Sequence, residues 1–260
     1  MQFFIPGILP ITLAAFMVWR DWKKGWRPEP VPRAGFWMLT ALLLFAFWCG
    51  GYFLADAATT EERARYLTPG LETQVPLLTD FSLIYILVFP LFFLPFFALR
   101  SERALRRAAL SNFLTLSLCT LTFFVFPVTF ARPALPGHAD ELGAWILSLV
   151  HGADPAWNCL PSEHCAMALV AALALLQERR WLGTWALVTA IGIAFSTLCL
   201  KQHYLVDGVI GFVVALGMTL GARWQGWERL SLSTSQKKKF GGDGVSSSRS
   251  SDGLQDSSEG

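Results

Sequence analysis

The sequence GFWMLTALLLFAFWCGGYFLA occupies positions 35–55 and contains no charged residue. A helix needs about 20 apolar residues to cross roughly 30 Å of hydrocarbon, so this stretch is long enough to span a membrane. Three further uncharged runs approach or reach that length, at residues 81–99, 110–130 and 181–200. The run 204–222 contains one charge, Asp207. Length and charge alone therefore predict five spans.

A sixth apolar run, 165–177, has only 13 residues unless its helix starts earlier, near Pro161. We expect a six-helix core in which this fourth helix begins below the membrane surface. The segment 2–19 is also apolar, but it contains two prolines and lacks the basic n-region of a secretory signal. We expect an extra N-terminal helix there, either spanning the membrane or lying at its surface. The fold class predicted is all-α, a polytopic membrane protein.

The composition favours the same class. The chain has 260 residues, of which 53% are hydrophobic and 15% charged, whereas an ordinary soluble domain is about a quarter charged. This excludes a soluble enzyme and a disordered chain. The net charge of +2 indicates no acidic partner, and we expect no nucleic acid partner. The five cysteines include no CxxC pair, which argues against a zinc cluster or a disulfide scaffold. Cys159 and Cys165 could pair in an oxidising compartment, but we expect small apolar side chains that fill space instead.

Lysine and arginine are unevenly distributed between the two sides of the expected membrane domain. One side carries most of them, in loops 20–34, 100–107 and 178–180 and in the stretch after 222. The other side holds Arg63, Arg65, Arg132 and Lys201. Because cytoplasmic loops carry the excess of Lys and Arg, loops 56–80, 131–163 and 201–203 are expected to face outward. Their shortness favours a bacterial inner membrane, with this side facing the periplasm.

Composition divides the chain into three regions. Residues 1–34 hold the N-terminal apolar segment and a basic loop, and residues 35–225 form the six-helix membrane domain. The sequence after 230 is rich in Ser, Gly, Asp and Lys, so it cannot bury enough apolar surface to offset its ordering entropy. We expect residues 226–260 to be a disordered cytoplasmic tail.

Ionisable residues gather on the outward side of the expected bundle. His203 and Asp207 lie four residues apart at the start of the last helix, so their side chains can touch. An aspartate inside a span is costly unless it has a partner. A carboxylate bonded to one imidazole nitrogen fixes the tautomer and raises the basicity of the other nitrogen. His203 is therefore a candidate nucleophile toward phosphorus, and a structural ion pair that caps the helix is the alternative.

Further residues on that side could bind an anion. The Ser162 hydroxyl and the first backbone N–H groups of the fourth helix can face one anion, and His164 could protonate a leaving oxygen. Arg132 and Lys201 would supply positive charge for phosphate oxygens, although either cation alone would be an interfacial residue. Together with the two histidines they describe a phosphate pocket.

These residues resemble the motifs of the type 2 phosphatidic acid phosphatase superfamily. The run Pro161-Ser162-Glu163-His164 resembles its second motif, PSxH, and the positions that resemble the third motif, SRx5HxxxD, are Ser196, His203 and Asp207. Arg132-Pro133 resembles the end of the first motif, Kx6RP. The resemblance covers roughly residues 35–225. It implies that His203 forms a phosphohistidine, Asp207 orients it and His164 is the general acid, with no cofactor and no metal. The phosphate ligands that it implies are Arg132, Ser162 and Lys201.

The chain departs from these motifs at two positions. Val125 stands where the first motif has Lys, and Thr197 stands where the third motif has Arg. Both changes remove a phosphate-binding cation. The remaining pattern resembles the branch that contains inositol phosphorylceramide synthase, in which Lys201 would replace part of the lost charge.

Three functions remain open. The first is a membrane phosphatase that hydrolyses a lipid phosphate through a phosphohistidine. The second is a phosphotransferase that moves a phospho-headgroup from a phospholipid to a lipid alcohol, and the lost cations favour it because a diester carries less charge than a monoester. The third is a transporter or a silent scaffold, which lacks support because the His/Asp pattern has no second copy. The expected partners are a phospholipid substrate and membrane lipids.

Overall fold

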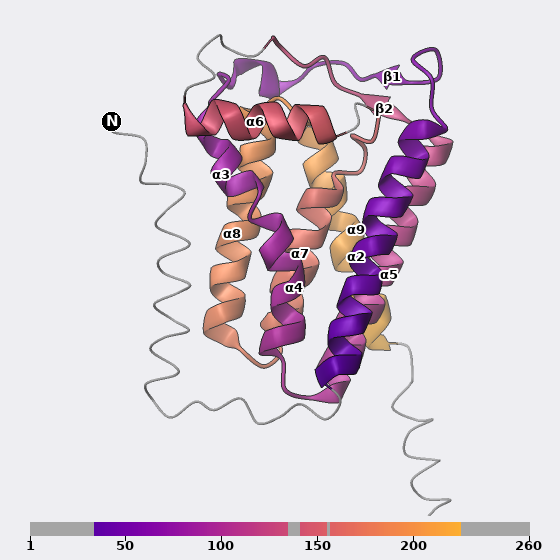
Figure 1. Ribbon diagram of the computed structural model, residues 1–260, viewed down its shortest axis with the longest axis vertical. Coiled ribbons are helices and arrows are strands. Elements are labelled where there is room, and N and C mark those ends of the chain that lie inside the picture. The colour runs from indigo at the N-terminus through magenta and orange to yellow at the C-terminus, as the bar shows by residue number, and fades with distance from the viewer. Residues whose placement is uncertain (1–33, 135–140, 155–156, 225–260) are drawn as a thin grey trace, which may run out of the picture. The chain divides into compact units, whose positions relative to one another are not determined.

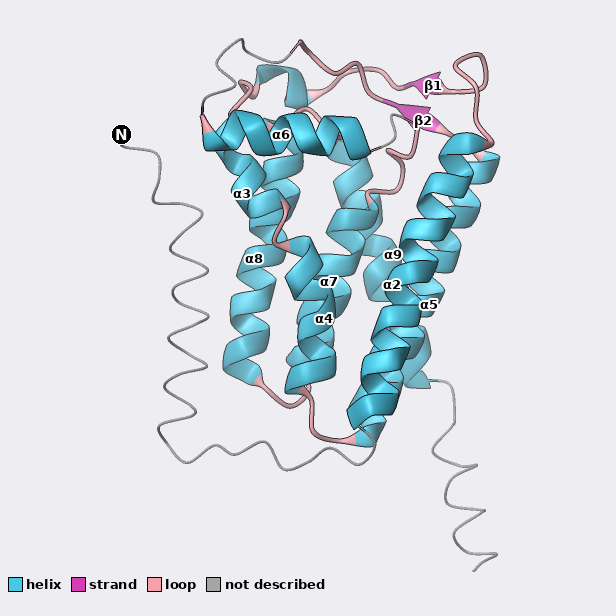
Figure 2. Ribbon diagram, viewed as in Figure 1, coloured by secondary structure: helices cyan, strands magenta, loops and turns pink. Residues whose placement is uncertain are grey.

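The structure, a computed structural model, describes residues 34–134, 141–154 and 157–224. Helices form nearly all of its regular structure, together with two short strands at one end (Figure 1, Figure 2). Five helical stretches are long and apolar enough to cross a membrane by length and composition. The prediction of an all-α polytopic membrane protein is therefore confirmed. The predicted N-terminal helix at 2–19 and the predicted tail at 226–260 lie outside the described residues.

The five stretches alternate with shorter elements along the chain. They are α2 (Ala34–Ala57), a broken stretch over Thr79–Ala98, α5 (Glu102–Val125), α8 (Arg180–Cys199) and α9 (Leu205–Trp224). The broken stretch consists of η2 (Thr79–Phe81), α3 (Ser82–Tyr85) and α4 (Val88–Ala98). The remaining elements are β1 (Arg65–Tyr66), η1 (Leu71–Gln74), β2 (Val128–Thr129), α6 (Leu142–Ala153) and α7 (Glu163–Leu175).

The predicted sixth helix is α7, and it lies at the centre of the bundle. It has 13 residues and is about 20 Å long, which is shorter than the hydrocarbon layer. Almost every residue of α7 is buried, because α4, α5 and α8 pack around it. A helix that is apolar on all sides is suited to such a place. The segment before it is also buried, at Asn158 and Ser162.

The third predicted span, 110–130, is displaced toward the N-terminus in the structure. The helix α5 begins at Glu102, where the Ser101 hydroxyl accepts a hydrogen bond from the backbone N–H of Ala104. The basic segment 100–107, for which the sequence predicts a loop, is therefore mostly helical. The helix ends at Val125 rather than Phe130, because Pro127 has no N–H to donate and disfavours a helical conformation at Phe126.

The outward segment 131–163 contains the helix α6, where the sequence predicts only a loop. Figure 1 shows α6 crossing the end of the bundle at which the two strands lie. One face of α6 is buried at Ala144 and Leu147, while Trp145 and Leu149 are exposed. The Ser82 hydroxyl donates to the carbonyl of Gly143 and attaches α6 to α3. The length of apolar runs does not predict this helix, because its 12 residues are too few for a span.

The loops predicted to face outward meet at one end of the bundle, which we call the outer end. It consists of the described residues of loops 58–78, 126–162 and 200–204. Strands β1 and β2 pair in parallel there, with Arg65 opposite Val128, and Val128 also bridges to Asn158. The loops 99–101 and 176–179 meet at the opposite end, which we call the inner end, where Glu178 accepts hydrogen bonds from Ser101. The grouping of the loops is confirmed for the described ones, while loop 20–33 and the stretch after 224 lie outside the described residues. The membrane orientation stays a prediction.

Candidate active site

His203 and Asp207 are in contact, as predicted, but they do not share a helix. The helix α9 begins at Leu205, so His203 lies in the turn before it, and its Nδ1 is 3.5 Å from Oδ2 of Asp207. The same Oδ2 accepts a hydrogen bond of 2.9 Å from the backbone N–H of Tyr204. A carboxylate in the first helical turn that bonds back to the residue before the helix is half of a capping box, and it fixes the helix start.

The imidazole of His203 is held in one tautomer. Its Nδ1 lies 2.9 Å from the carbonyl oxygen of Cys159. A carbonyl only accepts hydrogen bonds, so Nδ1 carries a proton, and in the neutral imidazole the lone pair is then on Nε2. Nε2 is buried and has no hydrogen-bond partner among the described residues, and the same is true of Oδ1 of Asp207. The arrangement leaves the nitrogen that could attack phosphorus available.

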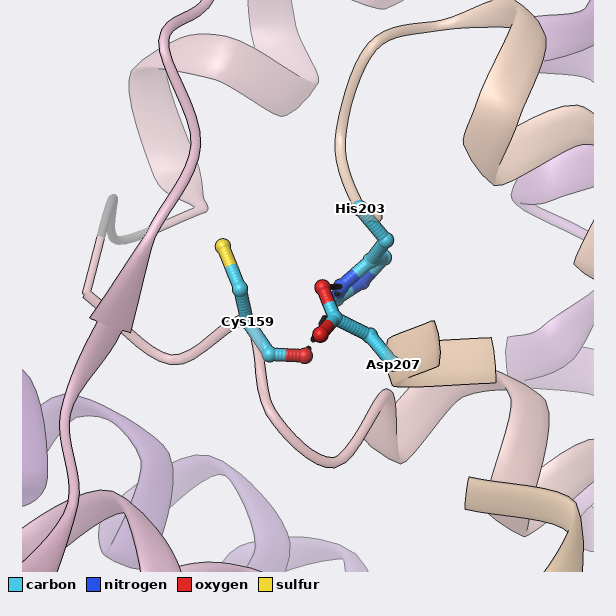
Figure 3. Close-up of side chains that lie close together, drawn as sticks. All are labelled: Cys159, His203 and Asp207. Carbon is cyan, nitrogen blue, oxygen red and sulfur yellow. Dashed lines mark hydrogen bonds and ion pairs between the residues drawn. The ribbon is translucent and has the colours of Figure 1, made fainter. Parts of the chain in front are cut away.

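Cys159 stands close to this pair, and Figure 3 shows how it is oriented. The ligand atoms of Cys159, His203 and Asp207 lie within 4.8 Å of one another, close enough to hold a metal ion. In Figure 3 the Cys159 carbonyl points toward the imidazole while the thiol points away from it. The thiol instead lies 3.6 Å from the carbonyl of Gln202. The contact that orders the three residues is thus the carbonyl–imidazole hydrogen bond.

Ser162 connects the second histidine to the first. Its hydroxyl accepts a hydrogen bond from the backbone N–H of Cys165 at 3.5 Å and caps α7, two residues before His164. Its own backbone N–H donates to the carbonyl of Asp207 at 2.9 Å. A Cβ on Gly211 would lie 2.4 Å from the Ser162 carbonyl oxygen, so only glycine allows α9 to approach α7 so closely.

His164 and His203 face each other inside the bundle. Their ring centroids are 6.3 Å apart, and both side chains are buried. The Tyr85 hydroxyl lies 3.2 Å from Nδ1 and 3.1 Å from Nε2 of His164, and the Tyr85 ring packs against the imidazole. The rings of Trp48 and Tyr52, both from α2, also contact His164. The predicted pair of histidines is therefore brought together, with aromatic walls around His164.

Arg132 reaches the same region through a carboxylate that sequence analysis missed. Its Nη2 lies 3.1 Å from Oδ2 of Asp154, and its Nη1 donates to the Asp154 backbone carbonyl at 2.8 Å. The Tyr52 hydroxyl donates to Oδ1 of Asp154, and the Tyr85 hydroxyl lies 3.4 Å from Oδ2. A hydrogen-bonded chain thus runs from Arg132 through Asp154 and Tyr85 to His164.

The tyrosines are the part of the sequence that could have indicated this hydrogen-bonded chain. The protein has only four of them, and Tyr52 and Tyr85 lie inside apolar runs. A buried tyrosine hydroxyl needs a hydrogen-bond partner, so two such residues predict polar groups nearby. That reasoning could have pointed to an acceptor at this end of the bundle, but not to Asp154 in particular.

The Lys201 ammonium group bonds to loop carbonyls and not to the histidines. It donates to the carbonyls of Glu72, at 2.6 Å, and of Val75, at the end of η1. The Lys201 backbone has a φ of 56°, which turns the chain between α8 and α9. The prediction that Lys201 replaces a lost phosphate-binding cation receives no support from this geometry, because the ammonium stabilises the loop instead.

Glu72 completes this loop. Its carboxylate accepts hydrogen bonds from the backbone N–H groups of Gly70 and of Leu205, the first residue of α9. Burial raises the pKa of the Glu72 carboxyl, but these N–H groups and Lys201 outweigh burial and leave that pKa below its ordinary value. Glu72 and Lys201 therefore attach η1 to the start of α9, next to His203.

The cysteines agree with the favoured prediction, in which they are small apolar side chains rather than a disulfide pair. Cys159 and Cys165 are not bridged to each other in the structure, and no disulfide occurs among its described residues. Both side chains are buried within the outer half of the bundle, where a small apolar side chain packs well.

Comparison with known proteins identifies one region of similarity. Residues 104–231 match a family model described as the PAP2 superfamily. The matched region contains every predicted site residue as well as Asp154, whereas Tyr52 and Tyr85 precede it. The searches of curated proteins and of solved structures found no match.

Proposed function

On the premise that residues 104–231 belong to the PAP2 superfamily, we propose that the chain is an integral membrane lipid phosphatase that works without a metal, through a phosphohistidine on His203. Members of this superfamily are phosphatases or phosphotransferases, so lipid phosphate chemistry is the general expectation. The observation that carries the specific proposal is the setting of His203, whose Nδ1 is fixed by the Cys159 carbonyl while Nε2 has no hydrogen-bond partner among the described residues.

The first half of the reaction makes the phosphohistidine. Nε2 of His203 forms a bond to phosphorus, and the bond from phosphorus to the lipid alcohol oxygen breaks. His164, as an imidazolium, gives its proton to that oxygen. Asp207, 3.5 Å from Nδ1 of His203, stabilises the positive charge that develops on the attacking imidazole.

The second half returns the enzyme to its starting state. His164, now neutral, takes a proton from water, whose oxygen attacks phosphorus. The bond between phosphorus and Nε2 breaks, inorganic phosphate leaves, and His164 is again an imidazolium. Arg132 and the N-terminus of α7 behind Ser162 bind phosphate oxygens in both halves.

A phospho-headgroup transferase is the second candidate, and the charge around the histidines favours it. Arg132 is already paired with Asp154, and the Lys201 ammonium is occupied by carbonyl groups. A site with little uncompensated positive charge suits a phosphodiester, which carries one negative charge, better than a phosphomonoester, which carries nearly two. In that case a lipid alcohol rather than water attacks the phosphohistidine, as in the inositol phosphorylceramide synthase branch.

One experiment distinguishes the candidates. The protein is placed in lipid nanodiscs with a chelator and given phosphatidic acid or a diester phospholipid, with and without a lipid alcohol, and the products are measured by mass. Phosphate released without an acceptor indicates a phosphatase, and headgroup on the acceptor with little free phosphate indicates a transferase. An acid-quenched single turnover with labelled phosphate should leave label on the wild-type protein and none on H203A.

A matched control keeps this test specific. Glu178→Gln changes one charged residue at the inner end and should retain both activity and label. The proposal is overturned if H203A, folded as judged by its thermal unfolding, retains the activity of the wild type.

We also propose that the outer end faces the periplasm of a bacterial inner membrane, because Lys and Arg are concentrated in the loops of the other end. An alkaline phosphatase reporter, which is active only outside the cytoplasm, should be active when fused after Gly70 and inactive when fused after Ser101. The reverse pattern would contradict this orientation.

A further inference from the structure

Asp154 is a carboxylate inside the candidate active site for which the reaction above has no use. Its side chain is 10% exposed. It accepts hydrogen bonds from Tyr52, Tyr85 and Arg132, and these come from three separate segments of the chain. The Tyr85 hydroxyl that it faces also touches both ring nitrogens of His164. The carboxylate is thus two hydrogen bonds away from the proposed general acid.

The place of Asp154 at the end of α6 does not explain its presence. Asp154 is the C-terminal cap of α6, and its backbone N–H donates to the carbonyl of Val150. The C-terminus of a helix carries a partial negative charge, so a carboxylate there is unfavourable for the helix itself. The three donors around the side chain offset that cost, and all three belong to the wall of the active site.

The ion pair changes the charge that a substrate meets. Arg132 is the cation that motif resemblance assigns to the phosphate, and its Nη2 is 3.1 Å from Oδ2 of Asp154. The pair as a whole is neutral. A phosphate bound by Arg132 therefore shares the guanidinium with a fixed negative charge, and each additional charge on the phosphate increases the repulsion from Asp154.

We propose that Asp154 is a specificity-determining residue that restricts the site to phosphate groups with a single negative charge, a class whose lipid members are phosphodiesters and singly protonated phosphomonoesters. This inference rests on the proposed function, because it assumes that phosphorus is attacked by His203 beside Arg132. It names the charge state of the substrate and applies whether water or a lipid alcohol completes the reaction.

The test compares two lipids that differ in charge and share their acyl chains. At pH 8 phosphatidic acid is nearly a dianion, since the second pKa of a phosphomonoester is about 6, while phosphatidylmethanol is a monoanion. Attack of His203 with expulsion of the lipid alcohol releases diacylglycerol from both. We measure kcat/KM for diacylglycerol release from each lipid in nanodiscs. Asp154→Asn removes the charge and nearly preserves the shape of the side chain. The two lipids differ in intrinsic reactivity, but this difference cancels when their kcat/KM ratio in D154N is compared with the ratio in the wild type.

We expect D154N to shift the ratio of kcat/KM values toward phosphatidic acid by about tenfold or more relative to the wild type. Tyr52→Phe is the matched control, because it removes one hydrogen bond from Asp154 and leaves the charge in place, and its ratio should stay within about twofold of the wild-type ratio. An unchanged ratio in D154N, or an equal shift in Y52F, would overturn the inference.

Two further measurements keep the result interpretable. If D154N does not fold, inhibition of the wild type at pH 8 by dimethyl phosphate, a monoanion, is compared with inhibition by methyl phosphate, nearly a dianion. Stronger inhibition by the dianion would also overturn the inference. H203A is assayed in parallel: diacylglycerol release that persists in H203A would refute the proposed function itself, whereas an unchanged ratio in D154N with an inactive H203A refutes only the role of Asp154.

Discussion

A glutamate holds the loops together at each end of the bundle, but the two surroundings differ. At the outer end Glu72 is buried, with 2% of its surface exposed, and accepts from the backbone N–H groups of Gly70 and Leu205. At the inner end Glu178 is exposed and accepts from the backbone N–H groups of Arg100 and Ser101. Both carboxylates accept from backbone N–H groups, and Glu178 also accepts from the Ser101 hydroxyl. The larger difference is the access of water, which reaches Glu178 and hardly reaches Glu72.

The difference shows at which end this protein buries ionisable side chains, whose burial costs free energy. The inner end carries exposed charges such as the pair Glu102–Arg106, which water solvates and which contribute little to stability. The outer end buries His164, His203, Asp207 and most of Asp154. Buried ionisable groups within a membrane domain require partners and usually mark function. The comparison therefore predicts large effects from changes at the outer end and small effects at the inner end.

The largest effect is expected at His164. If this residue protonates the leaving oxygen, His164→Ala should lower turnover of the lipid substrate by about 10²–10⁴-fold. A substrate with a p-nitrophenolate leaving group needs no proton and should lose far less. H203A should lose both activities alike, so the two histidines are separated by their response to the leaving group. Equal losses on both substrates in H164A would contradict the role of general acid.

The next effect concerns packing at the outer end. Gly211→Ala places a methyl group 2.4 Å from the Ser162 carbonyl oxygen, and such overpacking costs about 1–3 kcal/mol. Gly217, in the same helix, has open space where a side chain would begin, because no atom would lie within 4 Å of its Cβ. Gly217→Ala should therefore raise stability by up to about 1 kcal/mol. Thermal unfolding of the two variants in the same detergent measures the difference. Equal behaviour would show that α9 does not need the close approach.

A smaller effect is expected at Glu72, and it depends on pH. The pKa of this carboxyl is lowered in the folded protein, so the ionised form stabilises the fold above the unfolded pKa of about 4.3 and the contribution is lost as pH falls through the folded value. Glu72→Gln should cost about 1–3 kcal/mol at pH 7. The gap in melting temperature between wild type and variant should narrow on acidification to about pH 4, and a constant gap would refute the argument.

The smallest effect is expected at Glu178. Burial raises the pKa of its carboxyl, but hydrogen bonds from Ser101 and Arg100 outweigh burial and lower it overall, which gives the same sign of pH dependence as at Glu72. Because the side chain is exposed, Glu178→Gln should cost only about 0.5 kcal/mol at pH 7, and less at high salt. A loss as large as that in E72Q would show that burial does not distinguish the two ends.

The sequence predicts those parts of the molecule that depend on local apolar length. Apolar runs with at most one charge predict the spans, and the spacing of His203 and Asp207 predicts their contact, although His203 lies before the helix and not on it. The start of α5 was missed because the exposed residues of its first turns, such as Arg106, are as polar as a loop. Asp154 and the true partners of Lys201 were missed because their contacts join segments far apart in the chain, and no periodicity records which loops meet.

The hydrogen bond from the Ser162 backbone to the Asp207 carbonyl has a mechanical consequence. It ties the start of α7 to the start of α9, close in the chain to both His164 and His203. A thinner or thicker bilayer tilts helices, and a tilt of α9 against α7 then pivots near this bond. The far ends of the two helices swing apart or together, while the spacing of the two imidazoles changes little. We therefore expect turnover to depend only weakly on the acyl chain length of the surrounding lipid. In a bundle whose helices were not joined by such a bond, the dependence would be stronger.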